Sequence, residues 1–527
     1  MRTTGSILLL SLSLVLACES EQPAGQRGTP PSGTLPPRVE GPRVAEVDIP
    51  SEPPFVGEPG VDAFGNPRQR PDQIALLNLL RLRRFDVLDR FVTHYQDEFE
   101  ADHRREYWPR AALSAFEVGD PEVGERIDEW VRLMPESFAA VAARGSHRLG
   151  VGRHYRGGAT IGKTSRGQIE AMDAQLVAAI ADFEQALKMR PKLVAARTNL
   201  LRIANLRGPE AQERVQLDAA LAECPTCYTP RQAYLIALTP RWGGSYERMQ
   251  AYLDEIAPLV ASSPRLGLLA GMIPDDQCRS LAEAGKLAEA HVACDAALGF
   301  EGEATYLVGK AGLHARAKDY AAALPFLDRA LAIAPQDDTA LANRYFARLE
   351  TKDVLGAARD LIDLRHLDPS APNLGAKVEH MVGKLRYEGQ ELHEAGKYLE
   401  AADYFALGLQ LAPDDRDMAN RQAWNQKSIG FDDAKKQLAA APDDFALHLR
   451  VDHGLAASSR FAEVVEMWDG FIAAHPTDPR PFVERGGAKW HLGQHDDAIA
   501  DMRNACRLGM QTACDDVEKM KSRKPRG

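Results

Sequence analysis

The sequence predicts an all-α protein, an α-solenoid of stacked helical hairpins that follows a proline-rich N-terminal tether. Two observations lead to this fold class: prolines recur at a fixed period, and no alternation of strand and helix patterns indicates a parallel sheet. Proline lacks an amide donor and clashes with the preceding turn, so regularly spaced prolines mark repeated helix ends. The interval is 34 residues in three places, from Pro191 to Pro225, from Pro335 to Pro369 and from Pro442 to Pro476.

Residues at fixed positions inside the repeat support the same fold. They are Tyr320, Ala323, Leu327, Ala330 and Pro335 in one unit, and Tyr398, Ala401, Phe405, Gly408 and Pro413 in another. The pattern resembles the tetratricopeptide repeat (TPR), in which small residues let two helices approach closely and larger ones fill the gap beside them. The resemblance implies about ten to twelve units, degenerate near Gly430 and Val464, that coil around a concave groove for protein or peptide partners.

The N-terminus predicts a secreted, lipid-anchored protein. Residues 1–17 have the charged start and short apolar run of a signal peptide. That run ends in Val15-Leu16-Ala17-Cys18, which resembles the lipobox of bacterial lipoproteins and implies that Cys18 carries lipid. We therefore expect the bacterial cell envelope, with the outer membrane facing the periplasm favoured and surface display as an alternative. The alternative is an ordinary signal peptide followed by an incidental cysteine.

Residues 18–71 are interpreted as the lipidated cysteine and a disordered linker, because they hold about a third of the 33 prolines and almost no apolar pattern. The remainder divides into a TPR-like helical domain at 72–270, TPR repeats at 271–520 and a basic tail at 521–527. No stretch after the signal peptide is apolar for long enough to span a membrane as a helix.

Part of the first helical domain has a second resemblance. Residues 75–260 resemble an uncharacterised bacterial family of unknown function. The resemblance is carried by three segments: Leu82-Arg83-Arg84-Phe85, the predicted helix Met172 to Asp182, and Leu238 to Tyr246. The resemblance implies helices and no known activity. Within the third segment, aromatic and arginine side chains are candidate partner contacts, namely Arg241, Trp242 and Tyr246. The alternative is a tight turn before a helix that Ser245 caps.

A glycine-rich segment, Gly157 to Thr164, satisfies the P-loop pattern for nucleotide binding. That site requires a buried strand before the loop, and none is predicted. Pro135 and Pro191 lie 56 residues apart, 22 more than one repeat, so we interpret residues 151–168 as a loop inserted between the two helices of a hairpin. Its polar residues are candidates for binding an anionic partner: Arg153, His154, Tyr155, Arg156 and Lys163.

Seven cysteines leave six after lipidation of Cys18, an even number suited to an oxidising compartment. Cys224-Pro225-Thr226-Cys227 has the spacing of a dithiol redox site, but the thioredoxin-type fold would need strands that are not predicted. The even number of cysteines instead indicates three local disulfides, and two of the pairs are symmetric about predicted turns. The expected pairs are Cys224 with Cys227, Cys278 with Cys294, and Cys506 with Cys514; free buried thiols are the alternative.

The sequence disfavours several function classes. A net charge of -11 disfavours nucleic acid as a partner, because phosphate binding needs a clustered positive face. No HExxH motif or paired CxxC arrangement indicates a metal, no cofactor is expected, and no nucleophile elbow is present.

We therefore expect a non-enzymatic, membrane-anchored scaffold for protein–protein interaction or assembly in the cell envelope. The competing hypothesis is an enzyme, either nucleotide-binding through the segment at 157–164 or redox-active through Cys224 and Cys227. A passive envelope protein whose repeats bind carbohydrate is a third possibility.

Overall fold

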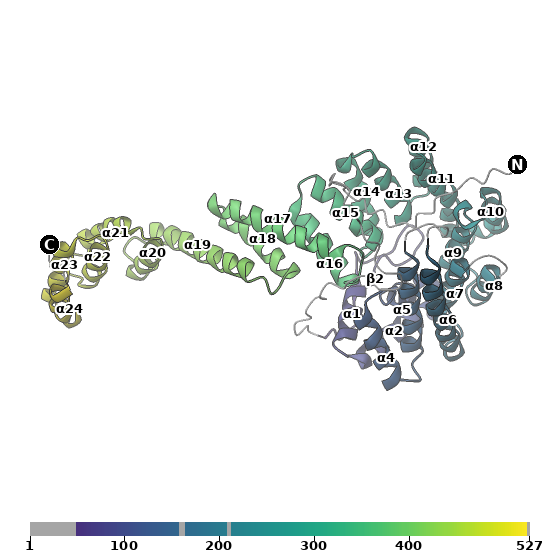
Figure 1. Cartoon of the computed structure of the whole chain (residues 1–527), viewed down its shortest axis with the longest axis horizontal. Coiled ribbons are helices and arrows are strands. Elements are labelled where there is room, and N and C mark those ends of the chain that lie inside the picture. The colour runs from purple at the N-terminus through teal and green to yellow at the C-terminus, as the bar shows by residue number, and fades with distance from the viewer. Residues whose placement is uncertain (1–48, 158–163, 208–211, 524–527) are drawn as a thin grey trace. The chain divides into compact units, whose positions relative to one another are not determined.

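The computed structural model describes residues 49–157, 164–207 and 212–523 (Figure 1). In this part of the chain the secondary structure is almost entirely α-helical, with helices α1 to α24 and one short pair of strands. The predicted all-α, TPR-like architecture is confirmed. None of the described helices is long and apolar enough to cross a membrane. The chain forms two compact units, Met1–Met381 and Val382–Gly527, which are described separately.

Unit 1 begins with an ordered segment that contradicts part of the predicted linker. Strand β1 pairs with β2 in antiparallel register, and helices follow at once. The first elements are β1 Phe55–Val56, β2 Arg70–Pro71, α1 Gln73–Arg81, α2 Phe85–Ala101, η1 His103–Arg105, α3 Tyr107–Ser114 and α4 Pro121–Leu133. The prediction of a disordered linker up to residue 71 is therefore wrong for residues 49–71. Phe55 anchors this segment by packing on the core that surrounds the fully buried Trp130.

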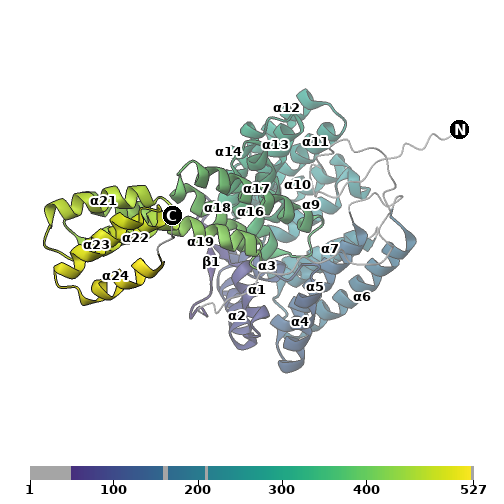
Figure 2. The same ribbon diagram turned by 60° about the vertical axis from the view of Figure 1, so that its left-hand side comes forward.

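A long hairpin occupies the place of the predicted loop insertion. Helix α5 (Phe138–Arg156) has 19 residues and α6 (Arg166–Met189) has 24, and the two lie side by side (Figures 1 and 2). Ser165 and Gln168 form a capping box that starts α6. The predicted loop at 151–168 is therefore too long, since residues 151–156 and 166–168 are helical. Much of the 22-residue excess lengthens the two helices.

The middle of unit 1 is less regular than a TPR array. Its elements are α7 Val194–Arg207, α8 Gln212–Glu223, α9 Thr229–Ala237, η3 Pro240–Trp242, α10 Tyr246–Val260, η4 Pro264–Gly271, α11 Met272–Glu283 and α12 Leu287–Leu298. One apolar core runs from Leu201 to Tyr306 through these elements. The domain boundary that we predicted near residue 270 falls inside this core, whereas the two compact units divide at residue 381.

The end of unit 1 consists of two regular hairpins, α13 Ala304–Arg316 with α14 Tyr320–Ile333, and α15 Asp338–Glu350 with α16 Val354–Leu367. Ala311, Ala323 and Leu327 are buried between α13 and α14, where the TPR pattern places a small residue against a larger one. Each hairpin closes through a lysine with positive φ, Lys318 at 59° and Lys352 at 67°.

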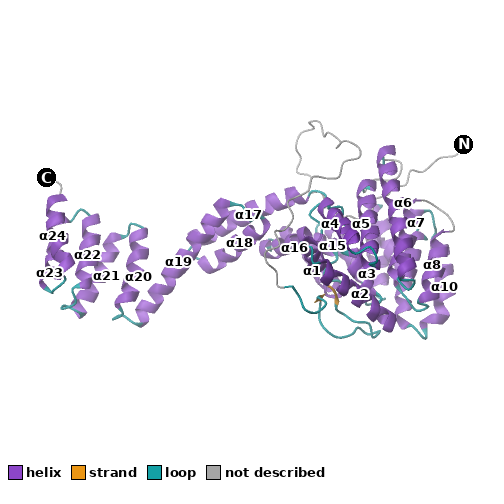
Figure 3. Ribbon diagram, turned by 90° about the horizontal axis from the view of Figure 1, so that it is seen from below, coloured by secondary structure: helices purple, strands orange, loops and turns teal. Residues whose placement is uncertain are grey.

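Unit 2 contains the longest helix of the described chain. The elements are α17 Leu374–Glu394, which enters the unit at residue 382, then α18 Tyr398–Leu411, α19 Arg416–Ala440, α20 Phe445–Ala457, α21 Phe461–Ala474, α22 Arg480–His491, α23 His495–Arg507 and α24 Gln511–Arg523. Helix α19 packs first on α18 and then on α20, so the repeat near Gly430 is one continuous helix (Figure 3). The repeat around Val464 is an ordinary hairpin, in which Trp468 is fully buried.

One ion-pair motif recurs in three repeats and was not anticipated. A basic pair at positions i and i+4 of the first helix holds one buried aspartate of the second helix. The three sets are Arg144 and Arg148 with Asp182, Arg344 and Arg348 with Asp360, and Arg485 and Lys489 with Asp501. The aspartate side chains are at most 4% exposed, so each charge is compensated inside its hairpin.

Candidate interaction surfaces

The cationic residues expected to bind an anionic partner at the end of α5 are engaged within the chain. Arg153 Nη1 lies 2.6 Å from Glu117 Oε1, and Arg202 reaches both oxygens of the same carboxylate at 2.6 and 2.7 Å. Burial raises the pKa of Glu117, but Arg202 and Arg153 outweigh it and leave this pKa far below its usual value. Arg153 therefore neutralises a buried carboxylate, although its own side chain is half-exposed.

The other residues of this predicted site are divided. His154 packs on Gly119, where an added Cβ would lie 2.7 Å from the imidazole, and Tyr155 packs on the core between α5 and α6. Arg156 donates from Nη1 to the Thr164 hydroxyl at 3.0 Å. Lys163 lies outside the described residues.

The described part of the P-loop-like segment lacks the framework of a nucleotide site. The segment follows the C-terminus of helix α5, where Gly157 has φ of +62°, instead of a buried strand. The strand aims the backbone amides of a true P-loop at the phosphates. This geometry favours a connection between two helices over a phosphate cradle.

The predicted contacts near residue 242 also meet their own chain. Arg241 Nη2 lies 2.7 Å from Asp276 Oδ1, and the Tyr246 hydroxyl lies 3.1 Å from the other oxygen of that carboxylate. Ser245 caps α10 by accepting from the Arg248 amide. The segment therefore has the turn geometry of the alternative interpretation. Trp242 lies half-buried in this turn.

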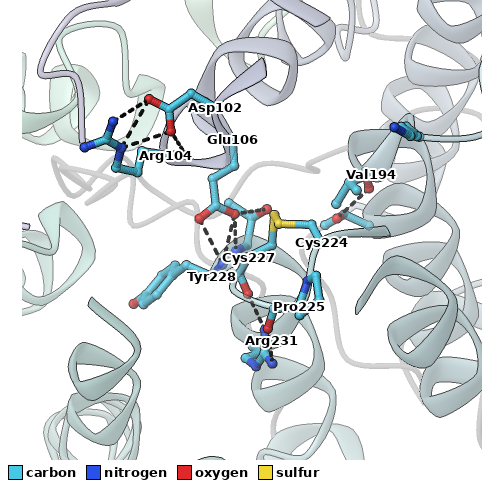
Figure 4. The surroundings of a disulfide bond; sticks show 12 residues. Asp102, Arg104, Glu106, Val194, Cys224, Pro225, Cys227, Tyr228 and Arg231 are labelled. Carbon is cyan, nitrogen blue, oxygen red and sulfur yellow. Dashed lines mark hydrogen bonds and ion pairs between the residues drawn. A yellow bond between two sulfur atoms is a disulfide. The ribbon is translucent and has the colours of Figure 1, made fainter. Parts of the chain in front are cut away.

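Figure 4 shows the surroundings of the Cys224–Cys227 disulfide, which lies between α8 and α9. Both cysteines are at most 1% exposed. Next to them, Glu106 accepts hydrogen bonds from the backbone amides of Tyr228 and Thr229, and Arg231 donates to the Cys227 carbonyl at 2.6 Å. A catalytic dithiol must be reachable by its substrate, so this burial favours a structural role over redox exchange.

The structure brings the other four predicted cysteines together in the expected pairs. Cys278 and Cys294 face each other across the α11–α12 hairpin with Cα atoms 5.0 Å apart, and Cys506 and Cys514 join α23 to α24 at 4.8 Å. The glycines of the two turns, Gly285 and Gly509, have positive φ. Their oxidation state in the isolated protein remains the prediction tested below.

A surface that we did not predict from the sequence lies on α17 and α19 of unit 2. We call it the α17–α19 face and define it by Tyr387, Gln390, Arg421 and Trp424. Arg421 Nη1 donates to Gln390 Oε1 at 2.7 Å, so these sides of the two helices meet. Tyr387 precedes Gln390 by one turn and Trp424 follows Arg421 by one turn, which places both rings beside this contact. Tyr387 is 66% exposed and Trp424 is 52% exposed.

The exposed Trp424 ring is held in place from below. Its centroid lies 4.0 Å from that of His393, which is buried. The His393 ring is in turn 2.8 Å from Asn425 Oδ1, and Asn425 Nδ2 donates to the Tyr398 carbonyl at 2.8 Å. A fixed aromatic side chain loses little conformational entropy on binding, which suits it to anchor a partner.

The described residues contain no group of three or more His, Cys, Asp or Glu side chains placed to hold a metal ion. A hollow of about 250 Å³ between α4, α5 and α6 is lined by Arg144, His147 and Tyr155 among others. Arg144 is paired with Asp182, and burial lowers the pKa of His147 to about 4, so this hollow carries little net charge near neutral pH.

No protein-family model and no curated protein matches the chain. Solved structures of TPR proteins are similar to it at low identity. The TPR domain of P58(IPK) is 13% identical, covers 77% of this chain and 95% of its own, and has a TM-score of 0.23. A tetratricopeptide repeat protein from Parabacteroides merdae is 18% identical over 47% of this chain and 98% of its own, with a TM-score of 0.19. The TPR2AB domain of yeast Sti1, solved in complex with pHSP90, is 13% identical over 48% and 96%, with a TM-score of 0.19.

Proposed function

We propose that this protein is a non-enzymatic scaffold that binds a protein partner through the α17–α19 face of unit 2. The observation that carries the proposal is the pair of exposed rings on adjacent helices, with Trp424 fixed from below by His393. Tryptophan, tyrosine and arginine are the residues that contribute most to protein interfaces. Two adjacent helices also present a continuous surface for a partner helix or an extended peptide.

The remaining predicted sites support this assignment by being engaged inside the chain. Arg153, Arg241 and Tyr246 contact buried acidic groups, and the Cys224–Cys227 pair is enclosed. Each of these residues supports the fold of unit 1. The α17–α19 face, by contrast, leaves two large rings in contact with solvent.

The experiment compares matched variants of the full chain. The double variant Tyr387→Ala with Trp424→Ala removes both rings, and the control Leu399→Ala removes a side chain of α18 that is 73% exposed. Crosslinking in cells identifies proteins that the wild type captures, and titration with the purified candidate then measures affinity. We expect at least a tenfold loss for the double variant and none for the control. Equal affinity for all three proteins would refute the assignment.

We further propose that the scaffold is anchored to the cell envelope through lipid on Cys18, which lies outside the described residues. The support is the lipobox-like sequence before it. Two or more acyl chains are needed for stable anchoring, because one chain binds only marginally. Cys18→Ala is expected to move the protein from the membrane to the soluble fraction, and mass spectrometry of the wild-type N-terminus should find a diacylglycerol adduct. An unmodified Cys18 in the mature protein would contradict the proposal.

A further inference from the structure

Residues 54–72, which we call the clasp, fold as a small hairpin on the surface of unit 1. Its backbone hydrogen bonds are mostly internal: β1 pairs with β2, Val61 bridges Pro67, and the Asp62 amide donates to the Asn66 carbonyl at 2.8 Å. The outward side is exposed, with Val61 at 57%. The clasp is therefore a self-contained element that binds the helices mainly through side chains.

The first set of contacts joins the clasp to α2 and α3. The Phe55 ring lies 5.4 Å from that of Tyr95 and 4.7 Å from that of Trp108. The Tyr95 hydroxyl donates to the Pro54 carbonyl at 2.7 Å, and Trp108 Nε1 donates to the Gln69 carbonyl at 3.0 Å. Phe55 thus packs against the rings of Tyr95 and Trp108. The same two side chains also donate hydrogen bonds to backbone carbonyl groups of the clasp.

The second set reaches elements about 200 residues later in the chain. Phe64 packs against the core of η4 and α13, close enough to Gly302 that an added Cβ would lie 3.4 Å from its ring. Asp62 lies 3.6 Å from Arg265 in η4. Repeats in a simple solenoid contact only their neighbours, so the clasp adds a contact between distant parts of unit 1.

Helix α1, directly after the clasp, makes further contacts with distant parts of unit 1. The Gln73 amide donates to Gln336 Oε1 at 2.7 Å, and Gln336 Nε2 donates to Asp72 at 2.8 Å. Arg81 Nη2 donates to the His366 carbonyl at 3.2 Å. Figures 1 and 3 show α1 beside α16.

The surface under the clasp contains buried polar atoms that the clasp leaves without a hydrogen bond. Arg265 is 8% exposed and lies between the rings of Tyr107 and Tyr228, at 4.5 and 5.2 Å from their centroids. Arg265 forms ion pairs at 3.6 Å with Asp62 of the clasp and at 3.8 Å with the buried Glu303, but its Nε and Nη1 atoms and Oε1 of Glu303 have no hydrogen-bond partner. Buried guanidinium groups ordinarily bond through most of their donors. At 3.6 Å, Asp62 pairs with Arg265 by charge but does not form a hydrogen bond with it.

We propose that this face of unit 1 is a docking surface for an extended protein segment, and that the clasp is its resident, displaceable ligand. The recognised chemistry is the one the clasp displays: an aromatic anchor, a carboxylate at the Arg265 position and a second aromatic ring close to it. A partner segment whose carboxylate reaches Arg265 at hydrogen-bond distance would compete with the clasp. The proposal adds a second surface to the scaffold, and it does not depend on the α17–α19 face.

The test uses a fluorescent synthetic peptide of residues 49–72 and the full chain. Because the resident clasp is tethered, its effective concentration is on the order of millimolar, so wild-type protein should bind the peptide weakly. The double variant Phe55→Ala with Phe64→Ala weakens the resident clasp and should bind the peptide at least tenfold more tightly. Val61→Ala, a change on the exposed side, should behave as wild type. A peptide lacking both phenylalanines should not bind.

Hydrogen exchange of the same proteins makes every outcome decisive. If residues 54–72 lose protection in the double variant and the peptide still does not bind, the vacated surface does not bind such a segment and the proposal is wrong. Unchanged protection would also overturn it, because the two rings would not hold the clasp. Should the double variant fail to fold, excess peptide must accelerate exchange of the resident clasp in wild-type protein, and the absence of acceleration refutes displacement. Failure of the partner capture at the α17–α19 face would leave these results unaffected.

Discussion

Replacing Glu117 with glutamine tests whether the charges predicted to bind a partner instead stabilise unit 1. The Glu117 side chain is 6% exposed and accepts from Arg202 through both oxygens and from Arg153 through one. Glu117→Gln keeps the shape of the side chain but removes its charge. Two guanidinium groups then lose their common counterion.

The expected cost follows from the burial of the three groups. Removing one partner of a fully buried ion pair typically costs about 3–5 kcal/mol, because the other charge stays uncompensated. The side chains of Arg202 and Arg153 are 22% and 55% exposed, so solvent can partly replace the lost carboxylate. We therefore expect Glu117→Gln to lower the free energy of unfolding of unit 1 by about 2–3 kcal/mol.

The assay is urea unfolding with pulsed hydrogen exchange, which reports on peptides from α5 and α7 separately from unit 2. Glu170→Gln is the matched control, because Glu170 and its partner Arg166 are 64% and 93% exposed and such surface pairs contribute about 0–1 kcal/mol. The control is expected to unfold at the wild-type urea concentration.

The pH dependence of the difference has a defined sign. The folded-state pKa of Glu117 is below its unfolded value, so its stabilisation is present above the unfolded pKa, roughly 4.3. It is lost as pH falls through the folded pKa. The gap between wild type and Glu117→Gln should therefore be full at pH 7 and shrink below about pH 4.3. A gap below about 0.5 kcal/mol at pH 7, or one that grows in acid, would refute the reasoning.

Three further predictions concern the repeats and the cysteines. Asp360→Asn and Asp501→Asn should each destabilise their own unit by about 2–4 kcal/mol in thermal unfolding, since each carboxylate is buried between two cations, and no change in either would contradict this role. Gly145→Ala should lower the free energy of unfolding by about 1–3 kcal/mol, because the added Cβ would lie 2.9 Å from the Phe183 ring. Gly312→Ala, whose Cβ would have nothing within 4 Å, should raise it by about 0.5–1 kcal/mol, and equal effects of the two changes would show that the close approach at Gly145 does not matter. Thiol titration of the denatured, unreduced mature protein should find none of the six paired cysteines reactive, and six reactive thiols would exclude the disulfides.

Local chemistry made most of the fold predictable. The closing prolines, the small residue at Ala323 and the aromatic ring of Phe405 identified hairpins because helix packing repeats with the chain. The cysteine pairs were also accessible from sequence, since two cysteines equidistant from a turn, as Cys278 and Cys294 are, face each other across an antiparallel hairpin. In each case the partner residue lies within one repeat.

The candidate surfaces were harder to predict because the type of a residue does not show whether its side chain is exposed in the folded protein. Arg153 and Arg241 are residue types that binding sites favour, yet each is paired with a carboxylate elsewhere in unit 1. Arg153 pairs with Glu117 in the α3–α4 connection, and Arg241 pairs with Asp276 of α11. Trp424 had no distinguishing pattern. The 34-residue offset from Gln390 was the available signal that it lies on the same side of the repeat as its neighbours.

The sequence by itself determined the helical repeat, its period and which cysteines lie next to each other, because these depend on contacts between residues close in the chain. Only the tertiary structure decided where the linker ends and which charges remain for a partner. Phe55 and Phe64 sit among prolines and glycines with no periodicity, and they gain a role only where Trp108 and the η4–α13 core come to meet them. Such long-range contacts depend on the curvature of the repeats in unit 1. That curvature is the sum of many small packing angles between helices, which no local sequence pattern encodes.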